Sequence, residues 1–370
     1  MIYKELCGER ISSLGLGCMR FPLADPDTKE VDMSATDDLI ACAIQNGINY
    51  FDTAWPYHND KSESILGELL AKYPRESYFL ATKYPAFEIS NMKDPAAIFE
   101  KQLANCKTDY FDFYLCHNVC ERNIDWFTDP QYGVVEYLIE QKKKGRIRHL
   151  GFSTHGSRTV IRRFIDAYRS ELEFCQIQLN YLDWKLQSAK EKVEMLTLYG
   201  LPIWVMEPVR GGRLAELDSD TMCSLAAFRP DASAAEWAFR FLQTIPGIGV
   251  ILSGMSNMDQ LTENINTFSA SKPLSKAEMR LILKVSDDMI AKRTVPCTAC
   301  GYCLTKCPRS LPIPDMIKAF NEKTAFKDAS PDSCIACRSC ESVCPQGIKI
   351  SEVMELYKNK IKEGAFNDQD

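Results

Sequence analysis

An acidic and a phenolic side chain stand just beyond an apolar, strand-like run and could act together in acid catalysis. The run Ile48–Phe51 leads directly into Asp52, and Tyr57 follows after the interrupting Pro56. Proline cannot continue a strand ladder or sit inside a helix, so we expect Tyr57 in a loop just past the strand. A free phenol titrates near pH ~10, so it needs a neighbouring cation if it is to act as an acid at neutral pH.

Two later strand-like runs end in residues that supply a cation and an imidazole. Tyr78–Thr82 ends at Lys83, and Tyr110–Cys116 ends at His117. Parallel βα folds keep their active sites at the carboxyl ends of their strands. Taken singly, a lysine is more often a surface residue, a histidine a packing residue, and Asp52 a helix cap. The order of all four residues on successive strand ends favours one shared site.

Asp52, Tyr57, Lys83 and His117 resemble the catalytic tetrad of the aldo-keto reductases, and the similarity extends over roughly residues 5 to 268. The resemblance implies hydride transfer between a nicotinamide cofactor, NADP or NAD, and a small-molecule carbonyl or alcohol. Tyr57 would donate the proton, Lys83 steadied by Asp52 would lower its pKa, and His117 would orient the carbonyl. The substrate itself is not readable, because the loops that set specificity in a barrel vary freely.

Strand-like runs alternate with helical patterns through most of the chain, which is the signature of βα units. We count eight units, which predicts an α/β fold, a (β/α)8 TIM barrel. The expected strands are Ile11–Gly17, Asn49–Thr53, Tyr78–Thr82, Tyr110–Cys116, Ile147–Phe152, Phe174–Leu179, Ile203–Met206 and Gly249–Leu252. Helical patterns between them include Thr36–Gln45, Val134–Lys144 and Ala234–Leu242. The family resemblance also implies that Met1–Glu9 plugs the bottom of the barrel.

Two glycine-containing loops could hold a phosphate group. Pro208 and Gly211 follow the seventh expected strand, and Gly254 and Ser256 follow the eighth. Barrels commonly hold phosphates with these loops, and the helix expected from about Met258 offers free N–H groups to an anion. Ordinary loop turns would explain the same glycines.

The resemblance assigns further cofactor contacts to named positions. Ser153 and Gln176 would hold the nicotinamide carboxamide, and Glu263 and Asn264 the adenine. The sequence departs from the better-known family pattern at Thr154, Met206 and Gln260. Gln260 cannot offer charged donors to a 2′-phosphate, so the choice between NAD and NADP stays open. The full expected set is Gly17, Cys18, Met19, Asp52, Ser153, Thr154, Gln176, Met206, Pro208, Gly211, Gly254, Ser256, Gln260, Glu263 and Asn264.

Eight of the sixteen cysteines fall in two C-terminal runs with metal-ligand spacing. Each run reads Cys-x-x-Cys-x-x-Cys-x-x-x-Cys-Pro, the pattern that binds 4Fe–4S clusters. Zinc also takes thiolates, but a zinc site needs only four of them and gives no reason for the second Cys-x-x-Cys step. The cysteines are Cys297, Cys300, Cys303, Cys307, Cys334, Cys337, Cys340 and Cys344.

The two cysteine runs repeat at an offset of 37 residues, and the repeat continues into helical runs that start near Pro314 and Ser351. This predicts a small, mainly α-helical, ferredoxin-like iron–sulfur domain. In such runs the fourth cysteine ligates the other cluster. We therefore expect one cluster on Cys297, Cys300, Cys303 and Cys344, and the other on Cys334, Cys337, Cys340 and Cys307. The expected domains are a barrel at 1–271, a linker helix at 272–293 and an iron–sulfur domain at 294–370.

Composition agrees with a large globular enzyme of 370 residues, with 45% hydrophobic residues and a net charge of −6. This charge gives no basic footprint for nucleic acid, and no apolar run approaches the ~20 residues that span a membrane. The first residues lack the apolar core of a signal peptide, and clustered thiolates suit a reducing compartment, so we expect a cytoplasmic protein.

The cysteine runs also raise the question of what the clusters do. Carbonyl reduction by the tetrad needs no metal, so the clusters suggest single-electron transfer, with a ferredoxin or flavoprotein as a possible partner. No flavin-binding motif is recognisable in the chain. Two alternatives remain: a one-electron reductase or redox sensor that uses the barrel for binding, and clusters that only stabilise the C-terminal part.

Overall fold

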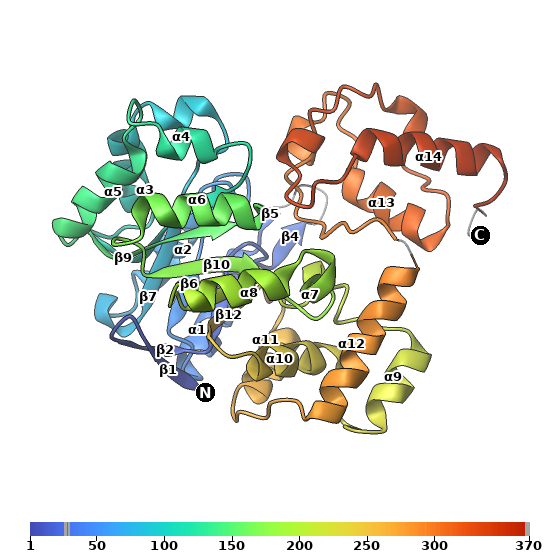
Figure 1. The fold of residues 1–370 in the computed structure, drawn as a ribbon, viewed down its shortest axis with the longest axis horizontal. Coiled ribbons are helices and arrows are strands. Elements are labelled where there is room, and N and C mark those ends of the chain that lie inside the picture. Colours follow the sequence, from blue (N-terminus) through green and yellow to red (C-terminus); the bar gives the residue numbers. More distant parts are fainter. Residues whose placement is uncertain (26–27, 29, 293, 367–370) are drawn as a thin grey trace.

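The computed structural model describes residues 1–370 except 26–27, 29, 293 and 367–370. Its largest element is a closed barrel of eight parallel strands in chain order (Figure 1). The strands are β3 (Leu14–Gly17), β6 (Tyr50–Asp52), β7 (Phe79–Tyr84), β8 (Phe111–Val119), β9 (Ile147–Thr154), β10 (Phe174–Gln178), β11 (Ile203–Met206) and β12 (Ile248–Ser253). The predicted TIM barrel is confirmed.

The strands differ from the sequence prediction mainly at their ends. The first expected run, Ile11–Gly17, is divided at Ser13, whose backbone N–H bonds to the carbonyl of Ile2. β7 and β8 run further than expected, so Lys83 and His117 lie inside strands instead of following them. Continued pairing with the neighbouring strands, such as Lys83 with Leu115, explains the extra length.

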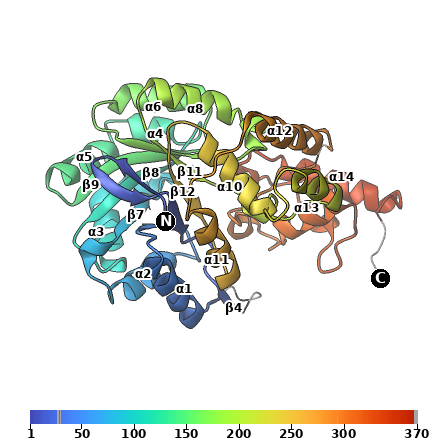
Figure 2. The same cartoon turned by 90° about the horizontal axis from the view of Figure 1, so that it is seen from below.

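A hairpin of β1 (Tyr3–Leu6) and β2 (Glu9–Ser12) lies at the amino-terminal end of the barrel (Figure 2). Leu6 and Cys7 pack on the side chains that fill the barrel interior, among them Phe113 and Trp204. The hairpin therefore covers this end of the barrel.

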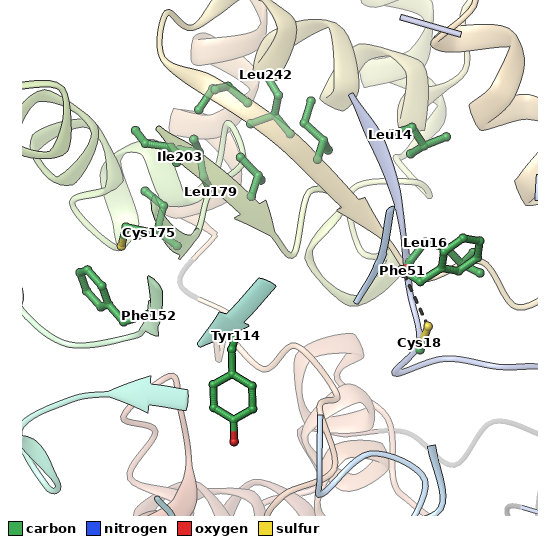
Figure 3. Packing of buried hydrophobic residues seen from close by; sticks show 14 of the residues in the cluster. Leu14, Leu16, Cys18, Phe51, Tyr114, Phe152, Cys175, Leu179, Ile203 and Leu242 are labelled. Atoms are coloured by element: carbon green, nitrogen blue, oxygen red, sulfur yellow. Dashed lines mark hydrogen bonds between the residues drawn. The ribbon is translucent and has the colours of Figure 1, made fainter. Parts of the chain in front are cut away.

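Helices surround the barrel and bury its outer face. They are α1 (Met33–Gln45), α2 (Ser62–Leu70), α3 (Pro95–Asn105), α4 (Ile124–Thr128), α5 (Val134–Lys143), α6 (Arg158–Tyr168), α7 (Asp183–Leu186), α8 (Ala189–Leu198), α9 (Ser219–Ala226), α10 (Ala234–Thr244), α11 (Met258–Thr267) and α12 (Lys276–Ala291). Strand residues such as Leu14, Phe152 and Ile203 pack with helix residues such as Leu242 in one continuous core (Figure 3). A short hairpin of β4 (Leu23–Asp25) and β5 (Glu30–Val31) follows β3.

Residues 294–366, which we call the C-terminal segment, form a second hydrophobic core around two helices. These are α13 (Ile313–Glu322) and α14 (Ile350–Lys362), which begin within a residue of the predicted starts. Met316 and Tyr357 are buried between them. Short 3-10 turns, Leu304–Lys306 and Glu341–Val343, join the third and fourth cysteines of each run. Among the described residues, no helix is long and apolar enough to cross a membrane.

Candidate active site at the carboxyl end of the barrel

Lys83 forms the centre of a buried polar cluster at the carboxyl end of the barrel. Its Nζ lies 2.5 Å from Oδ1 of Asp52 and 2.7 Å from the carbonyl oxygen of Thr53. It also lies 3.5 Å from the phenolic oxygen of Tyr57. The Lys83 side chain is fully buried and Asp52 is 3% exposed, so water does not screen this ion pair. The structure thus brings three of the four expected catalytic residues into one contact network.

The strands and one tight turn fix these three side chains. Asp52 is the last residue of β6 and pairs with Gly17 of β3 and Ala81 of β7. Beyond β6 the chain turns, with the N–H of Tyr57 bonded to the carbonyl of Ala54, and this turn returns the phenol over the strand end. Since β6 and β7 are hydrogen-bonded neighbours, the Asp52 and Lys83 side chains meet.

His117 completes the set from β8. Its ring stands nearly perpendicular to that of Tyr57, with centroids 6.2 Å apart, and it packs edge-on against Phe87. Burial, followed by the charge of Lys83, holds the pKa of His117 well below 6.5, so the imidazole is neutral at physiological pH. Its Nδ1 is buried and has no hydrogen-bond partner among the described residues.

Tyr57 is held as a neutral phenol. Burial, followed by the negative charge of Asp52, raises its pKa well above 10. The sequence interpretation had expected Lys83 to lower this pKa, and in this structure the burial dominates. A protonated phenol is nevertheless the form that can donate a proton.

A cavity opens above this network, and it is lined by residues from every predicted part of the cofactor site. The expected contacts that line it are Gly17, Met19, Asp52, Ser153, Gln176, Met206, Pro208, Gly211, Gly254, Ser256, Gln260, Glu263 and Asn264. Tyr57 and His117 line the same cavity. The Oε1 of Gln176 and the Oδ2 of Asp52 are buried without a partner among the described residues. These free acceptors fit the amide and hydroxyl donors of a nicotinamide riboside.

Two expected contacts point elsewhere. Cys18 packs in the core beside Leu16 and Phe51 (Figure 3). The Thr154 hydroxyl donates to the carbonyl of Val119 at 2.6 Å and so ties together the ends of β8 and β9. Successive strand residues face opposite sides, so Ser153 and Thr154 do not share the cavity.

The eight C-terminal cysteines gather into two groups. Cys307, Cys334, Cys337 and Cys340 line one small cavity. Burial, followed by the nearby thiols of Cys300, Cys297, Cys344 and Cys340, raises the pKa of Cys303, so the other three cysteines of the first expected group lie near it, as does Cys340 of the second. Eight soft thiolate donors in two groups of four suit iron–sulfur clusters.

Comparison with known proteins identifies both parts of the chain. The model of the aldo/keto reductase family matches residues 13–287, which is more than half of the sequence. The chain belongs to the aldo/keto reductase family. A model of a 4Fe-4S dicluster domain matches residues 296–348, within the C-terminal segment. This reductase is therefore an oxidoreductase in which a 4Fe-4S dicluster domain follows the barrel in the sequence.

Relatives of this reductase match the barrel. An uncharacterized oxidoreductase of Bacillus subtilis, YqkF, is 26% identical over 303 residues, covering 74% of this chain and 92% of that protein. The holo form of aldo-keto reductase AKR11C1 from Bacillus halodurans superposes with a TM-score of 0.63 at 24% identity, covering 77% of this chain and 96% of that one. An aldo/keto reductase from Klebsiella pneumoniae in complex with NADP and acetate gives a TM-score of 0.61 at 17% identity, with the same coverage of 77% and 96%. The similarity to these two solved structures supports the assignment of the barrel fold.

The C-terminal segment of the reductase docks on the loops that follow β10 and β11. The buried pair Arg210–Asp183 holds the guanidinium in place, and Arg210 donates to the carbonyl of Pro296 and to the side chain of Gln346, each at 3.2 Å. Gln346 also exchanges hydrogen bonds with Gln178. The cluster-binding loops are thereby fixed against the barrel.

Docking brings residues into the reductase cavity that the sequence analysis did not assign to it. Thr298, Cys300, Tyr302, Pro345 and Gln346 line it from the C-terminal segment, and His155 and Glu207 from the barrel. Burial raises the pKa of Glu207 and lowers that of His155 to about 4. The one available signal for Tyr302 was its position between two cluster ligands, which does not show what the ring faces.

Proposed function

We propose that this reductase converts an aldehyde or ketone to an alcohol with a hydride from a nicotinamide cofactor, Tyr57 supplying the proton. The observation that carries the proposal is the contact of Lys83 with both Asp52 and Tyr57 inside a cavity. A bound nicotinamide would supply the hydride to the carbonyl carbon. The carbonyl C=O π bond breaks, and its oxygen takes the proton from Tyr57.

The residues around Tyr57 support each part of this role. As the phenol loses its proton, the ammonium of Lys83, 3.5 Å from the phenolic oxygen, stabilises the phenolate. Asp52 neutralises and positions the buried ammonium. The neutral His117 orients the substrate oxygen from the adjacent strand. Ser153, Gln176 and Met206, which line the cavity, would hold the nicotinamide ring.

Replacing Tyr57 with Phe tests this assignment. A positioned general acid contributes ~10²- to 10⁴-fold, so Tyr57→Phe should remove most of kcat toward a panel of aldehydes and ketones. Binding of NADH and NADPH, followed by fluorescence quenching, should stay near the wild-type values. Tyr84→Phe, which changes a buried phenol outside this cavity, serves as the control. Full turnover by the Tyr57 variant would reject the assignment.

We further infer that the eight cysteines hold two 4Fe–4S clusters that exchange electrons at the same cavity. Cys300 lines the cavity together with Tyr57, so a cluster on that thiolate would lie beside the reacting groups. A ferredoxin or flavoprotein is the kind of partner that could supply or remove the electrons singly. A redox sensor that only binds nicotinamide is the alternative, and the Asp52–Lys83–Tyr57 contact speaks against it because binding alone does not require it.

A further inference from the structure

A thiol, an imidazole and a carboxylate meet at the amino-terminal end of the barrel, the end opposite the proposed active site. They belong to Cys7, His149 and Glu173, and one potential ligand atom from each side chain lies within 4.8 Å of the other two. Cys7 is in the turn between β1 and β2, His149 is in β9, and Glu173 directly precedes β10. Three segments that are far apart in the sequence therefore contribute one metal-binding donor each.

The hairpin turn brings the Cys7 thiol to the start of the barrel strands. Leu6 pairs with Glu9, so Cys7 and Gly8 form a two-residue turn, and their φ angles are +55° and +81°. Turns with two positive φ angles favour Asn, Asp or Gly, so the turn itself does not require a cysteine. The Sγ of Cys7 lies 3.9 Å from the backbone carbonyl oxygen of Glu173. The thiol is thus held beside the segment that carries the carboxylate.

His149 is oriented as metal-binding histidines are. Its Nδ1 lies 2.7 Å from Oε2 of Glu173, and its Nε2 lies 3.9 Å from Oε1 of Glu9. The ring stacks on Phe113, with centroids 4.8 Å apart, which fixes its plane. A histidine that binds a metal through one nitrogen usually directs the other toward a carboxylate or a carbonyl. Here Nδ1 faces the other two donors, and Glu9 is the carboxylate nearest to Nε2.

The charges around the three donors suit a divalent cation. The Nζ of Lys142 forms an ion pair with Oε1 of Glu173 at 2.8 Å, which leaves Oε2 for a metal. A zinc ion bound by one thiolate, one carboxylate and a neutral imidazole has no net charge, and the charges of Lys142 and Glu9 balance each other. The side chain of Glu173 is 29% exposed, so an ion can reach the donors from solvent.

We propose that Cys7, His149 and Glu173 form a zinc site with water as the fourth ligand. Zinc binds sulfur, nitrogen and oxygen at about 2.0–2.3 Å in tetrahedral geometry, which separates the ligand atoms by roughly 3.3–3.7 Å. The donors therefore need to approach one another by only about 1 Å. Magnesium and calcium prefer oxygen ligands, so the thiol favours zinc over them. On binding, Cys7 releases its proton to water and the thiolate forms the Zn–S bond.

The site gives the amino-terminal hairpin a link to the barrel that depends on metal. Zinc would join the hairpin turn to β9 and to the start of β10. A ligand that binds only the folded chain stabilises it, so zinc should raise Tm. This inference does not depend on the proposed carbonyl reduction, because none of the three donors lines the catalytic cavity.

Zinc binding to the anaerobically purified full chain, with its clusters, tests the site. Equilibrium dialysis against micromolar zinc should leave one zinc atom per chain in addition to the iron. Loss of an outer partner of a metal site typically costs 10- to 100-fold in affinity, so Cys7→Ser and Glu173→Gln should each weaken zinc binding at least about 10-fold. Cys223→Ser removes an exposed thiol of α9 and should bind zinc as the wild type does. Zinc should raise the Tm of the wild type and of Cys223→Ser, but not that of Cys7→Ser.

X-ray absorption at the zinc edge identifies the ligands in the wild type, so it does not depend on the folding of any variant. We expect one sulfur at about 2.3 Å and nitrogen or oxygen ligands at about 2.0 Å. Four sulfur ligands would show that zinc has entered one of the C-terminal cysteine runs instead. That spectrum, the absence of bound zinc, or equal zinc affinity in Cys7→Ser and the wild type overturns the proposal.

Discussion

The carbonyl oxygen of Thr298 lies 2.2 Å from the position that a β-carbon on Gly211 would occupy. Gly211 is in the loop after β11, where the sequence interpretation assigned the glycine to close approach of a phosphate. In the structure the close approach is that of the C-terminal segment. The loop that would hold the cofactor is therefore also the surface on which the iron–sulfur segment rests.

Gly211→Ala should push the segment away from the cavity. The added β-carbon collides with the Thr298 backbone, which cannot move as a flexible side chain can, and φ at Gly211 is +66°. We expect faster hydrogen exchange over residues 294–303 and a loss of most carbonyl turnover. Gly212→Ala is the matched control, because Gly212 also has a positive φ of +98° but a β-carbon there meets nothing within 4 Å. Equal exchange in the two variants would mean that backbone strain, not the collision, governs the loop.

Variants of the Asp52–Lys83 pair can distinguish an effect on stability from an effect on catalysis. Removing one partner of a buried ion pair typically costs about 3–5 kcal/mol, because the other charge stays buried and uncompensated. Asp52→Asn should thus lower Tm by several degrees, whereas the double variant Asp52→Asn with Lys83→Met should recover most of the Tm. Neither should reduce carbonyls at more than a small fraction of the wild-type rate. Recovery of activity in the double variant would contradict the role of Lys83.

The pH dependence of carbonyl reduction follows from the shifted pKa values of Tyr57 and His117. The pKa of Tyr57 is raised well above 10, so the phenol stays protonated and able to donate as pH rises to 10. The pKa of His117 is lowered well below 6.5, so the ring stays neutral as pH falls to 6.5. A plot of kcat/KM for carbonyl reduction should therefore be flat between these limits. A fall with an apparent pKa between 7 and 9 would assign the acid role to a different group.

The barrel and the proximity of Asp52, Tyr57, Lys83 and His117 could be predicted because they depend on local order along the chain. Each βα unit repeats the same pattern, so Asp52, Lys83 and His117 fall at neighbouring strand ends wherever the barrel forms. Thr154 was placed in the site by the family resemblance, but alternation along β9 turns its side chain away from the cavity. The inward position of Tyr302 could not be read, because it depends on how two cores dock. That docking depends on single contacts between distant residues, such as the bond from Arg20 to Thr298, which lie 278 residues apart in the sequence. Such contacts leave no periodic pattern in the sequence.

Gln260 is the position that should control the choice between NADH and NADPH. It lines the cavity near Glu263, and its Oε1 accepts a hydrogen bond from the backbone N–H of Ser256 at 2.8 Å. Gln260→Arg adds charged donors that fit a 2′-phosphate, so NADPH should bind about 10-fold more tightly while NADH changes little. Gln260→Leu is the control for loss of the Ser256 bond. Fluorescence titration of both cofactors would check this, and a parallel gain for NADH would show that the phosphate is not what the arginine binds.

Cys307 and Cys344, the fourth cysteines of the two runs, should affect different clusters when they are replaced. Only replacement of Cys344 should affect the cavity. Anaerobically purified wild type should contain about eight iron atoms per chain. On the proposed pairing, Cys344→Ser removes a ligand from the group of Cys297, Cys300 and Cys303, and Cys307→Ser removes one from the other group. Each variant should lose the magnetic resonance signal of one cluster, and the two should lose different ones.

Cys300 lines the cavity together with Tyr57, so loss of the cluster proposed on this thiolate should change how electrons leave the protein. After reduction with dithionite and removal of the excess, wild-type cluster absorbance should recover when oxidised nicotinamide or substrate is added without oxygen. Cys344→Ser should lose this recovery, whereas Cys307→Ser should keep part of it, since its damaged cluster lies in the more distant group. Matching Tm values for the two variants would exclude general unfolding as the cause. Cluster reoxidation that depends on neither nicotinamide, substrate nor an added ferredoxin would leave the clusters with a structural role, since ligation also supplies folding free energy.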